Sequence, residues 1–260
     1  MSNDNKRSGG KNGGQNMMNK TQNQSNNSRY KLFNDEAKDI TGKTYGGFEY
    51  TGDGQEQEDF FKKYSNYDEL INSMSQDEKM AFLGWAAGDF MRGEMYKDWD
   101  KMADWAKKET KVYDKFLDKA ILKHGVVVSR DSTAELIFGK GHKTATLDEL
   151  KAAEGQIVSS KSAMSTGAAK TGLSIGDSSK QILYRISIPA GAKGAGMWIA
   201  DSRIHGWGRA QLEFMTNRDS IFKVGKTVWD DRLKKYIVNL KWVGHSKHSY
   251  GKSAKARNWA

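Results

Sequence analysis

The hydrophobic pattern of this chain changes its period at Gly125, and this change constrains the fold more than any other feature. Upstream, from Asp59 to His124, apolar side chains recur every three or four residues, which is typical of amphipathic helices. Downstream, β-branched and aromatic residues alternate with polar ones in several short runs, which is typical of strands. The sequence therefore predicts an α+β fold, with a helical N-terminal portion followed by mostly antiparallel strands.

Two local signals predict where helices begin and end. Ser75 and Glu78 have the spacing of a capping box, so a helix should begin directly after Ser75. A later helical run should stop at Gly125, because glycine is a common residue just past a helix C-terminus. We expect three or four helices in this portion.

Turn residues divide the second portion into strands. The run Ile182–Ile188 alternates clearly, and Asp230 with Asp231 should form a hairpin turn between the last two runs. The segment Gly155–Gly167 is expected as a single strand with small hydroxyl residues at its end. No internal repeat is apparent.

The two ends of the chain differ from its centre. Residues 1–55 are rich in Asn, Gln, Gly, Ser and Lys, so we expect a disordered polar tail. From Arg232 to Ala260 there are eight Lys or Arg and no acid, within a chain of formal net charge +10. We therefore expect a folded domain over 56–244 and a basic C-terminal tail over 245–260, which would be attracted to polyanions.

Composition excludes several kinds of site. The chain contains no cysteine, which removes disulfides, thiolate metal sites and cysteine nucleophiles. His245 and His248 are close in sequence, but no carboxylate follows Asp231 to complement them, so we expect surface histidines and no metal.

The N-terminus has no apolar run behind its basic residues, and no segment approaches the ~20 apolar residues of a membrane span. We expect a monomer made in the cytoplasm without a signal peptide. Export by a signal-less route and packaging in a virus particle both stay open.

Three short segments carry the main candidate functional side chains. In GRAQLEFM, Gln211 and Glu213 would point to one face of a strand, placing an amide beside a carboxylate. Arg130 ends the strand VVVSR, where a guanidinium can fork onto phosphate oxygens. Ser165 and Thr166 lie in SAMSTG, where a hydroxyl can orient a carboxylate on a neighbouring strand.

Trp207 lies between Gly206 and Gly208. This pattern fits a mobile turn that presents the indole outward, and it equally fits a bend with the indole in the core.

The order and flanks of these segments resemble the ADP-ribosyltransferase exotoxin family of bacteria and phages. Its members have a helical portion, a strand ending in arginine, a Ser-Thr-Ser strand, an I-x-I-P-x-G-x-x-G segment and a Glu-x-Glu or Gln-x-Glu strand. This chain has RISIPAGAKGAGMWIA at the fourth position, and the resemblance covers roughly Asp59 to Val243. It departs from the family at Gly167, where the last serine would stand, and at Gln211, where many members have glutamate.

The resemblance implies a mixed, mostly antiparallel two-sheet β core. It also implies a mono-ADP-ribosyltransferase that passes ADP-ribose from NAD to a host protein, releases nicotinamide, has a possible NAD glycohydrolase side activity and needs no metal. Because Gln-x-Glu members resemble the Rho-modifying, C3-like group, the acceptor would be asparagine or glutamine rather than arginine. The implied roles are catalysis by Glu213, Gln211 and Ser165, NAD binding by Arg130, Ser165 and Thr166, and acceptor recognition by Trp207 and Gln211.

A second interpretation stays open. The chain would be a non-enzymatic basic protein that binds nucleic acid or belongs to a virion, with Gln211 and Glu213 as ordinary strand residues. The acid-free stretch after Arg232 supports it. A transferase domain attached to a phage structural or delivery protein would combine both interpretations.

Overall fold

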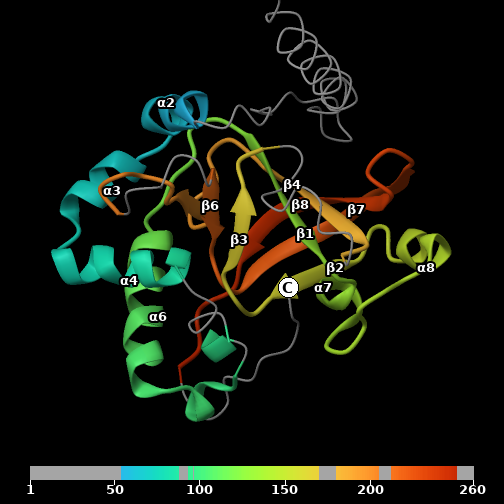
Figure 1. Ribbon diagram of the computed structural model, residues 1–260, viewed down its shortest axis with the longest axis horizontal. Coiled ribbons are helices and arrows are strands. Elements are labelled where there is room, and N and C mark those ends of the chain that lie inside the picture. The colour runs from blue at the N-terminus through green and yellow to red at the C-terminus, as the bar shows by residue number, and fades with distance from the viewer. Residues whose placement is uncertain (1–53, 88–92, 96, 170–179, 205–211, 251–260) are drawn as a thin grey trace, which may run out of the picture. The chain divides into compact units, whose positions relative to one another are not determined.

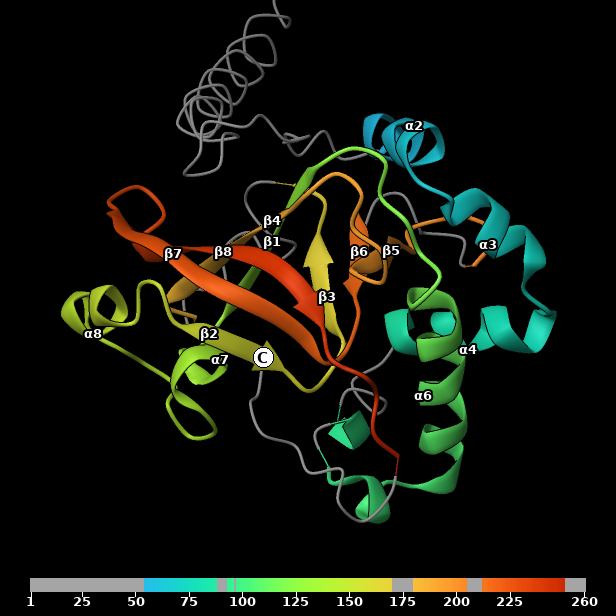
Figure 2. The same ribbon diagram turned by 180° about the vertical axis from the view of Figure 1, so that it is seen from behind.

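A computed structural model describes residues 54–87, 93–95, 97–169, 180–204 and 212–250. In these residues helices come first and most strands follow, which confirms the α+β prediction (Figure 1). The N-terminal helices lie beside one end of the sheet and two short later helices lie near the other, and the view from behind agrees (Figure 2). Within the described ranges, no helix is both long and apolar enough to pass through a bilayer.

Four α-helices with defined bounds precede the first strand in the described residues, and residues 93–95 are helical as well. The described bounds before the first strand are α2 Gln55–Tyr64, α3 Tyr67–Ser73, α4 Gln76–Ala87 and α6 Asp104–Leu117, with the 3-10 turn η1 Trp99–Lys101 before α6.

Helix α4 begins where the capping box predicts. The backbone N–H of Ser75 donates to Oε2 of Glu78 at 2.8 Å, and the N–H of Glu78 donates to Oγ of Ser75 at 3.2 Å. Two N–H groups that the helix leaves without an internal partner are thereby satisfied.

The predicted stop at Gly125 is wrong, because α6 already ends at Leu117. Ile121 and Leu122 continue the apolar spacing but form isolated bridges to other segments, and the N–H of Leu122 donates to the carbonyl of Ala192 at 2.9 Å. The helical pattern in the sequence thus extends over residues whose backbone pairs elsewhere.

Helix α6 packs against α4 through an apolar stripe at helical spacing. Ala106, Tyr113 and Leu117 are buried on one face of α6. The ring of Tyr113 meets those of Phe82 and Trp85 edge-on, and its hydroxyl donates to the carbonyl of Ala81 at 2.8 Å. This packing fixes the position of Trp85.

Helix α2 packs on the sheet through one aromatic side chain. Phe61 is 1% exposed and stacks on Trp198 and Phe214, with ring centroids 5.1 and 5.5 Å away. Burying a phenylalanine of this kind contributes about 1.5–3 kcal/mol, so α2 holds the strands that carry these two rings.

All eight described strands hydrogen-bond in the order β2-β7-β8-β4-β1-β3-β6-β5, and β4 with β8 is the parallel pair. Their bounds are β1 Val126–Ser132, β2 Ile157–Ser160, β3 Met164–Gly167, β4 Ile182–Ile188, β5 Gly196–Trp198, β6 Glu213–Thr216, β7 Ser220–Asp230 and β8 Lys235–His245.

The sheet consists of a five-stranded part, from β2 to β1, and a three-stranded part, from β3 to β5. Among the described residues, the two parts join through a single pair, Ser129 with Gly167. By contrast, β1 and β4 pair along their whole length, from Val126 with Ile188 onward. The two sheets implied by the family resemblance are therefore two parts of one hydrogen-bonded sheet, joined at one point.

The segment Gly155–Gly167 forms two strands rather than the single strand expected. Strand β2 pairs with β7 in the five-stranded part, and β3 pairs with β6 in the three-stranded part. Residues 161–163 separate the two strands, so the chain passes from one part to the other within a few residues.

The hairpin between β7 and β8 turns where the sequence predicts. Oδ1 of Asp230 accepts the backbone N–H groups of Arg232 and Leu233, both at 2.9 Å, as an aspartate at the start of a turn does.

Two short helices follow β1 that the sequence analysis did not predict, α7 Glu135–Phe138 and α8 Leu147–Ala152. The second has its own capping box, formed by Thr146 and Glu149, so the T-x-x-E pattern there would have revealed it.

Candidate active site

Glu213 and Ser165 meet across the three-stranded part of the sheet. Gly167 stands directly opposite Glu213, and Ser165, two positions earlier on β3, shares the face of Gly167. The hydroxyl of Ser165 donates to Oε1 of Glu213. Because Gly167 has no side chain, nothing on that residue stands between the hydroxyl and the carboxylate.

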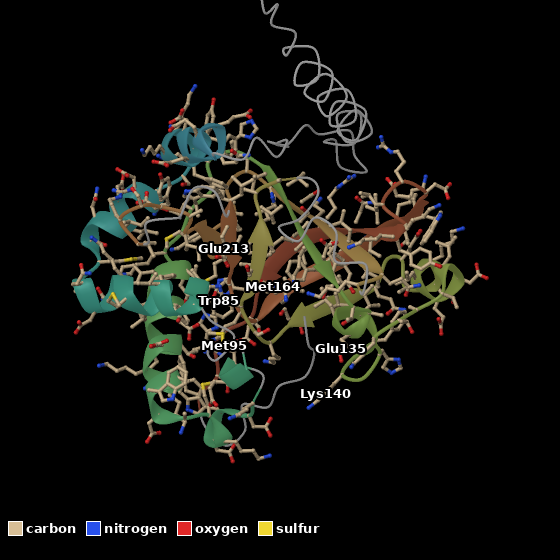
Figure 3. The ribbon with its side chains drawn as sticks, in the orientation of Figure 1. Trp85, Met95, Glu135, Lys140, Met164 and Glu213 are labelled. Carbon is tan, nitrogen blue, oxygen red and sulfur yellow. The ribbon has the colours of Figure 1, made fainter. Side chains whose placement is uncertain are left out.

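A third residue, Trp85 of α4, holds the same oxygen. Its indole N–H donates to Oε1 of Glu213 at 3.1 Å. Figure 3 shows Trp85 and Glu213 close together, one from the helical layer and one from the sheet. Trp85 could not be predicted as a site residue, because a tryptophan within a helical run has the same sequence pattern as an ordinary core residue.

The Glu213 carboxylate is buried. Its residue is 1% exposed, and Ser165 is 8% exposed. A buried carboxylate is costly unless hydrogen bonds replace its water, and the two donors on Oε1 provide such replacement. Residues 170–179 and 205–211, which lie close in sequence to β3 and β6, are outside the described ranges.

Arg130 lies on the other side of the junction between the two parts. It belongs to β1 and its Nη1 donates to the backbone carbonyl of Ser165 at 2.7 Å. Tyr184 is its partner across β1 and β4, and burial raises the pKa of Tyr184, so that its hydroxyl stays protonated and donates to the carbonyl of Thr133 at 2.9 Å. The structure thus brings Arg130, Ser165 and Glu213 together, as expected.

Thr166 faces the opposite side of β3 from Ser165, because neighbouring strand residues alternate in direction. Its hydroxyl donates to the carbonyl of Phe214 at 2.5 Å, and the residue is fully buried. This contact holds β3 to β6. A role of Thr166 in NAD binding stays a prediction.

Gln211 and Trp207 lie outside the described residues. The expectation that Gln211 and Glu213 share one face of a strand assumed a continuous strand. However, β6 begins only at Glu213, and Leu212 before it has a φ of 49°. A left-handed residue interrupts the alternation on which that expectation depends.

The sequence from residue 62 to residue 243 matches the model of the ADP-ribosyltransferase exoenzyme family, which is more than half of the chain. The chain belongs to this family. No curated protein sequence matches it significantly.

Solved structures agree on the fold. Plx2a, an ADP-ribosyltransferase toxin from Paenibacillus larvae, is 18% identical with a TM-score of 0.62, over 76% of this chain and 99% of that one. The Clostridium limosum C3 exoenzyme is 14% identical with a TM-score of 0.59, over 77% and 98%. C3stau2 from S. aureus, solved with NAD, is 14% identical with a TM-score of 0.57, over 77% and 99%.

Membership in the family makes this chain an NAD-dependent ADP-ribosyltransferase of the toxin class. As in this family, NAD is the substrate that supplies ADP-ribose.

Proposed function

We propose that this transferase passes ADP-ribose from NAD to an asparagine or glutamine side chain of a host protein, with Glu213 as its catalytic carboxylate. The observation that carries the proposal is the hydrogen bond from Ser165 to Glu213, made beside the guanidinium of Arg130. An acid, a hydroxyl and a cation from three different strands converge there, as the family resemblance requires.

In the proposed reaction the bond between nicotinamide and ribose breaks, and nicotinamide leaves with the bonding electrons. Positive charge develops on the ribose ring in the transition state and is absent in the ground state. A fixed carboxylate beside that ring stabilises the developing charge and so lowers the barrier. The acceptor nitrogen then forms the new bond to the ribose carbon and loses a proton.

Ser165 and Trp85 would act by positioning Glu213. Both donate to the same carboxylate oxygen, one from β3 and one from α4, so they restrict how the side chain can rotate. Ser165 would also contact NAD, as the family resemblance implies.

Arg130 would bind the phosphate or ribose side of NAD. A guanidinium carries five N–H donors in a planar fork, so the hydrogen bond of Nη1 to the Ser165 carbonyl orients the group for contacts with phosphate oxygens. We propose Thr166 as a further contributor to NAD binding through its position on β3.

The nature of the acceptor rests on Gln211 and Trp207. Gln211 stands where arginine-modifying relatives have glutamate, so arginine is disfavoured as the target, and Trp207 would contact the acceptor protein. Hydrolysis of NAD by water would be a side reaction in the absence of an acceptor. We place the catalytic domain at 56–244, between the polar tail 1–55 and the basic tail 245–260.

Labelled NAD and a host lysate test the proposal. Wild-type protein should label a host protein, and Glu213→Gln should lower transfer by about 10²-fold or more while the Kd for NAD changes little. Glu69→Gln, an exposed position on α3, is the matched control and should retain full activity. Equal losses of NAD binding and transfer in Glu213→Gln would refute the catalytic role.

Nucleic-acid binding remains the second candidate. Its support is the acid-free stretch after Arg232, but one of the eight basic residues there, Lys235, is buried and paired with Asp131 at 2.8 Å. Binding through the remaining charges should fall steeply as salt rises, whereas cleavage of NAD should persist.

A further inference from the structure

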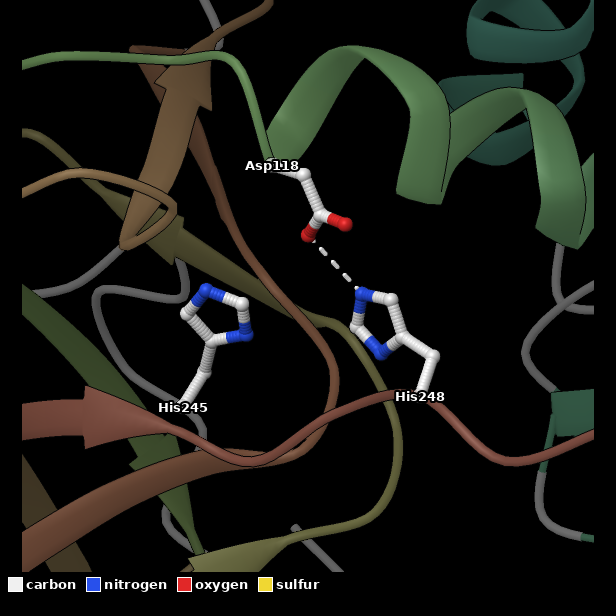
Figure 4. Close-up of side chains that lie close together, drawn as sticks. All are labelled: Asp118, His245 and His248. Atoms are coloured by element: carbon white, nitrogen blue, oxygen red, sulfur yellow. Dashed lines mark hydrogen bonds and ion pairs between the residues drawn. The ribbon is translucent and has the colours of Figure 1, made fainter.

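Three potential metal ligands lie together on segments other than the strands that carry the proposed catalytic residues. Asp118 is the C-cap residue of α6, His245 ends β8, and His248 follows three residues later. One ligand atom from each of the three lies within 4.8 Å of the other two. Figure 4 shows the two imidazole rings and the carboxylate grouped around one space, with His248 Nε2 bonded to Asp118 Oδ1 at 2.9 Å.

Neighbouring residues form hydrogen bonds with two of these ligands. The Nδ1 of His248 contacts Oδ2 of Asp219 at 3.1 Å, which leaves Nε2 directed at Asp118. The side-chain amide of Asn217 donates to Oδ1 of Asp118 at 2.8 Å. A histidine whose second nitrogen bonds a carboxylate is the usual arrangement around protein-bound zinc, since it sets the tautomer and the ring orientation.

Other charged groups near the cluster already have partners. Arg218 forms two hydrogen bonds of 2.7 Å with Asp114, the hydroxyl of Tyr250 donates to Asp114 at 2.6 Å, and Lys161 pairs with Asp219 at 2.7 Å. Asp114 Oδ1 lies 3.5 Å from Nε2 of His248 and is committed to Arg218. Arg218 and Lys161 therefore neutralise Asp114 and Asp219. Asp118 is the carboxylate that contributes negative charge to the cluster.

We propose that Asp118, His245 and His248 bind a zinc-like divalent cation, with Asp219 positioning His248 and water completing a tetrahedral site. Two imidazoles and one carboxylate are ligands that zinc accepts, and four-coordinate geometry with one water is a common zinc arrangement. The ion would have a structural role, because none of its three ligands comes from β1, β3 or β6.

The geometry requires small side-chain movements. Zinc bonds of about 2.0–2.2 Å hold neighbouring ligand atoms roughly 3.3 Å apart. The separations here run from 2.9 Å, for His248 and Asp118, to at most 4.8 Å. Rotation of His245 toward the other two ligands, away from its 3.2 Å contact with the Ser246 carbonyl, would meet this requirement together with slight opening of the hydrogen bond.

A proton is the competitor for this site. A metal ion must displace the proton on Nε2. Binding is therefore best measured near pH 8, where zinc stays soluble at micromolar concentration and the proton competes less.

The ion would clamp the end of α6 to the segment after β8. That segment begins the basic tail, and Tyr250 on it already meets α6 through Asp114. A metal was not expected from the sequence, because no carboxylate follows Asp231 near the two histidines. The fold supplies Asp118 from far upstream, where local sequence spacing gives no indication of a ligand.

Calorimetric titration of the full chain tests the site. Protein made without a histidine tag is treated with a chelator, freed of it, and titrated with zinc chloride, with magnesium chloride as the comparison. We expect one zinc per chain with a Kd in the micromolar range or tighter, a higher thermal unfolding midpoint with zinc, and no saturable magnesium binding. Absence of saturable zinc binding would overturn the proposal.

Variants assign the binding to these residues. His245→Ala should weaken zinc binding at least roughly tenfold, and Asp219→Asn should weaken it about 10- to 100-fold by releasing His248. His142→Ala, an exposed histidine on another part of the chain, should bind zinc like the wild type. Circular dichroism confirms that each variant is folded, and a folded His245→Ala protein with the wild-type Kd would refute the assignment.

Discussion

The indole N–H of Trp85 lies 3.1 Å from Oε1 of Glu213, the oxygen that also accepts the hydroxyl of Ser165. Trp85 and Glu213 are 128 positions apart and belong to α4 and β6. The helical portion therefore contributes directly to the environment of the Glu213 carboxylate, which is proposed to be catalytic, in addition to covering the sheet.

Trp85→Phe should lower kcat by roughly tenfold with little change in KM for NAD. Phenylalanine keeps most of the packing against Tyr113 but removes the N–H, and a hydrogen bond to a charged group is worth about 1.5–3 kcal/mol. Steady-state kinetics of NAD cleavage measure both constants. Trp105→Phe, on an exposed side chain of α6, is the control and should leave them unchanged. A rise in KM alone would assign Trp85 to substrate binding.

Ser165→Ala should also lower kcat by about tenfold or more, because the carboxylate loses its second donor. The double variant with Trp85→Phe should show non-additive losses, since both residues act on one oxygen atom. A double-mutant cycle on kcat/KM measures the coupling. Strictly additive effects would mean that the two donors do not position Glu213 jointly.

The pair Asp201 and Arg203 should make stability depend on pH. Burial raises the pKa of Asp201, but two hydrogen bonds from the Arg203 side chain, at 2.8 and 2.7 Å, outweigh it and the net pKa is lowered. A carboxyl with a lowered pKa in the folded state stabilises the fold above its unfolded value, about 3.9, and loses this contribution as pH falls further.

Arg203→Met should therefore lower the free energy of unfolding by about 2 kcal/mol at pH 7, a figure discounted for the partial exposure of Arg203. The difference from wild type should shrink as pH falls below about 4, because protonated Asp201 no longer needs the guanidinium. Urea unfolding between pH 3.5 and 7 measures it. Lys107→Met, which breaks an exposed pair with Asp104, should have little effect at any pH. A pH-independent loss in Arg203→Met would contradict the linkage.

Alanine substitutions at two glycines would distinguish the stability cost of backbone strain from the cost of steric overlap. Gly139 and Gly196 have φ values of 90° and 150°, which side-chain-bearing residues rarely adopt. A Cβ on Gly139 meets nothing within 4 Å, whereas one on Gly196 would lie 2.4 Å from the carbonyl oxygen of Met215. Gly139→Ala should cost about 1–3 kcal/mol from strain, and Gly196→Ala should cost a further 1–3 kcal/mol from overlap with β6. Denaturant unfolding measures the free energy of unfolding of both variants. Equal losses of stability would show that β6 shifts to relieve the overlap at no measurable cost.

Local chemistry made much of the fold predictable from sequence. The capping box at Ser75 and the turn at Asp230 depend on residues within a few positions of each other, and both are confirmed. The prediction that the helix ends at Gly125 was wrong, because Ile121 and Leu122 keep a helical spacing in sequence while their backbone pairs with distant segments.

The candidate site was predictable where a family pattern linked distant residues. That pattern indicated the meeting of Arg130, Ser165 and Glu213. No pattern indicated Trp85, since a buried tryptophan looks the same in sequence whether its N–H meets a carboxylate or a carbonyl. Gln211 and the acceptor choice it implies remain predictions from sequence.

Among the described residues, Ser129 with Gly167 is the one strand pair that joins the two parts of the sheet, and the proposed active site lies beside it. Arg130 belongs to the five-stranded part and Glu213 to the three-stranded part, so a small rotation of one part against the other would alter the distance between guanidinium and carboxylate. NAD bound to residues of both parts would restrict the movement of one part relative to the other. Part of the free energy of NAD binding would then offset the cost of fixing the orientation of the nicotinamide ribose relative to the Glu213 carboxylate.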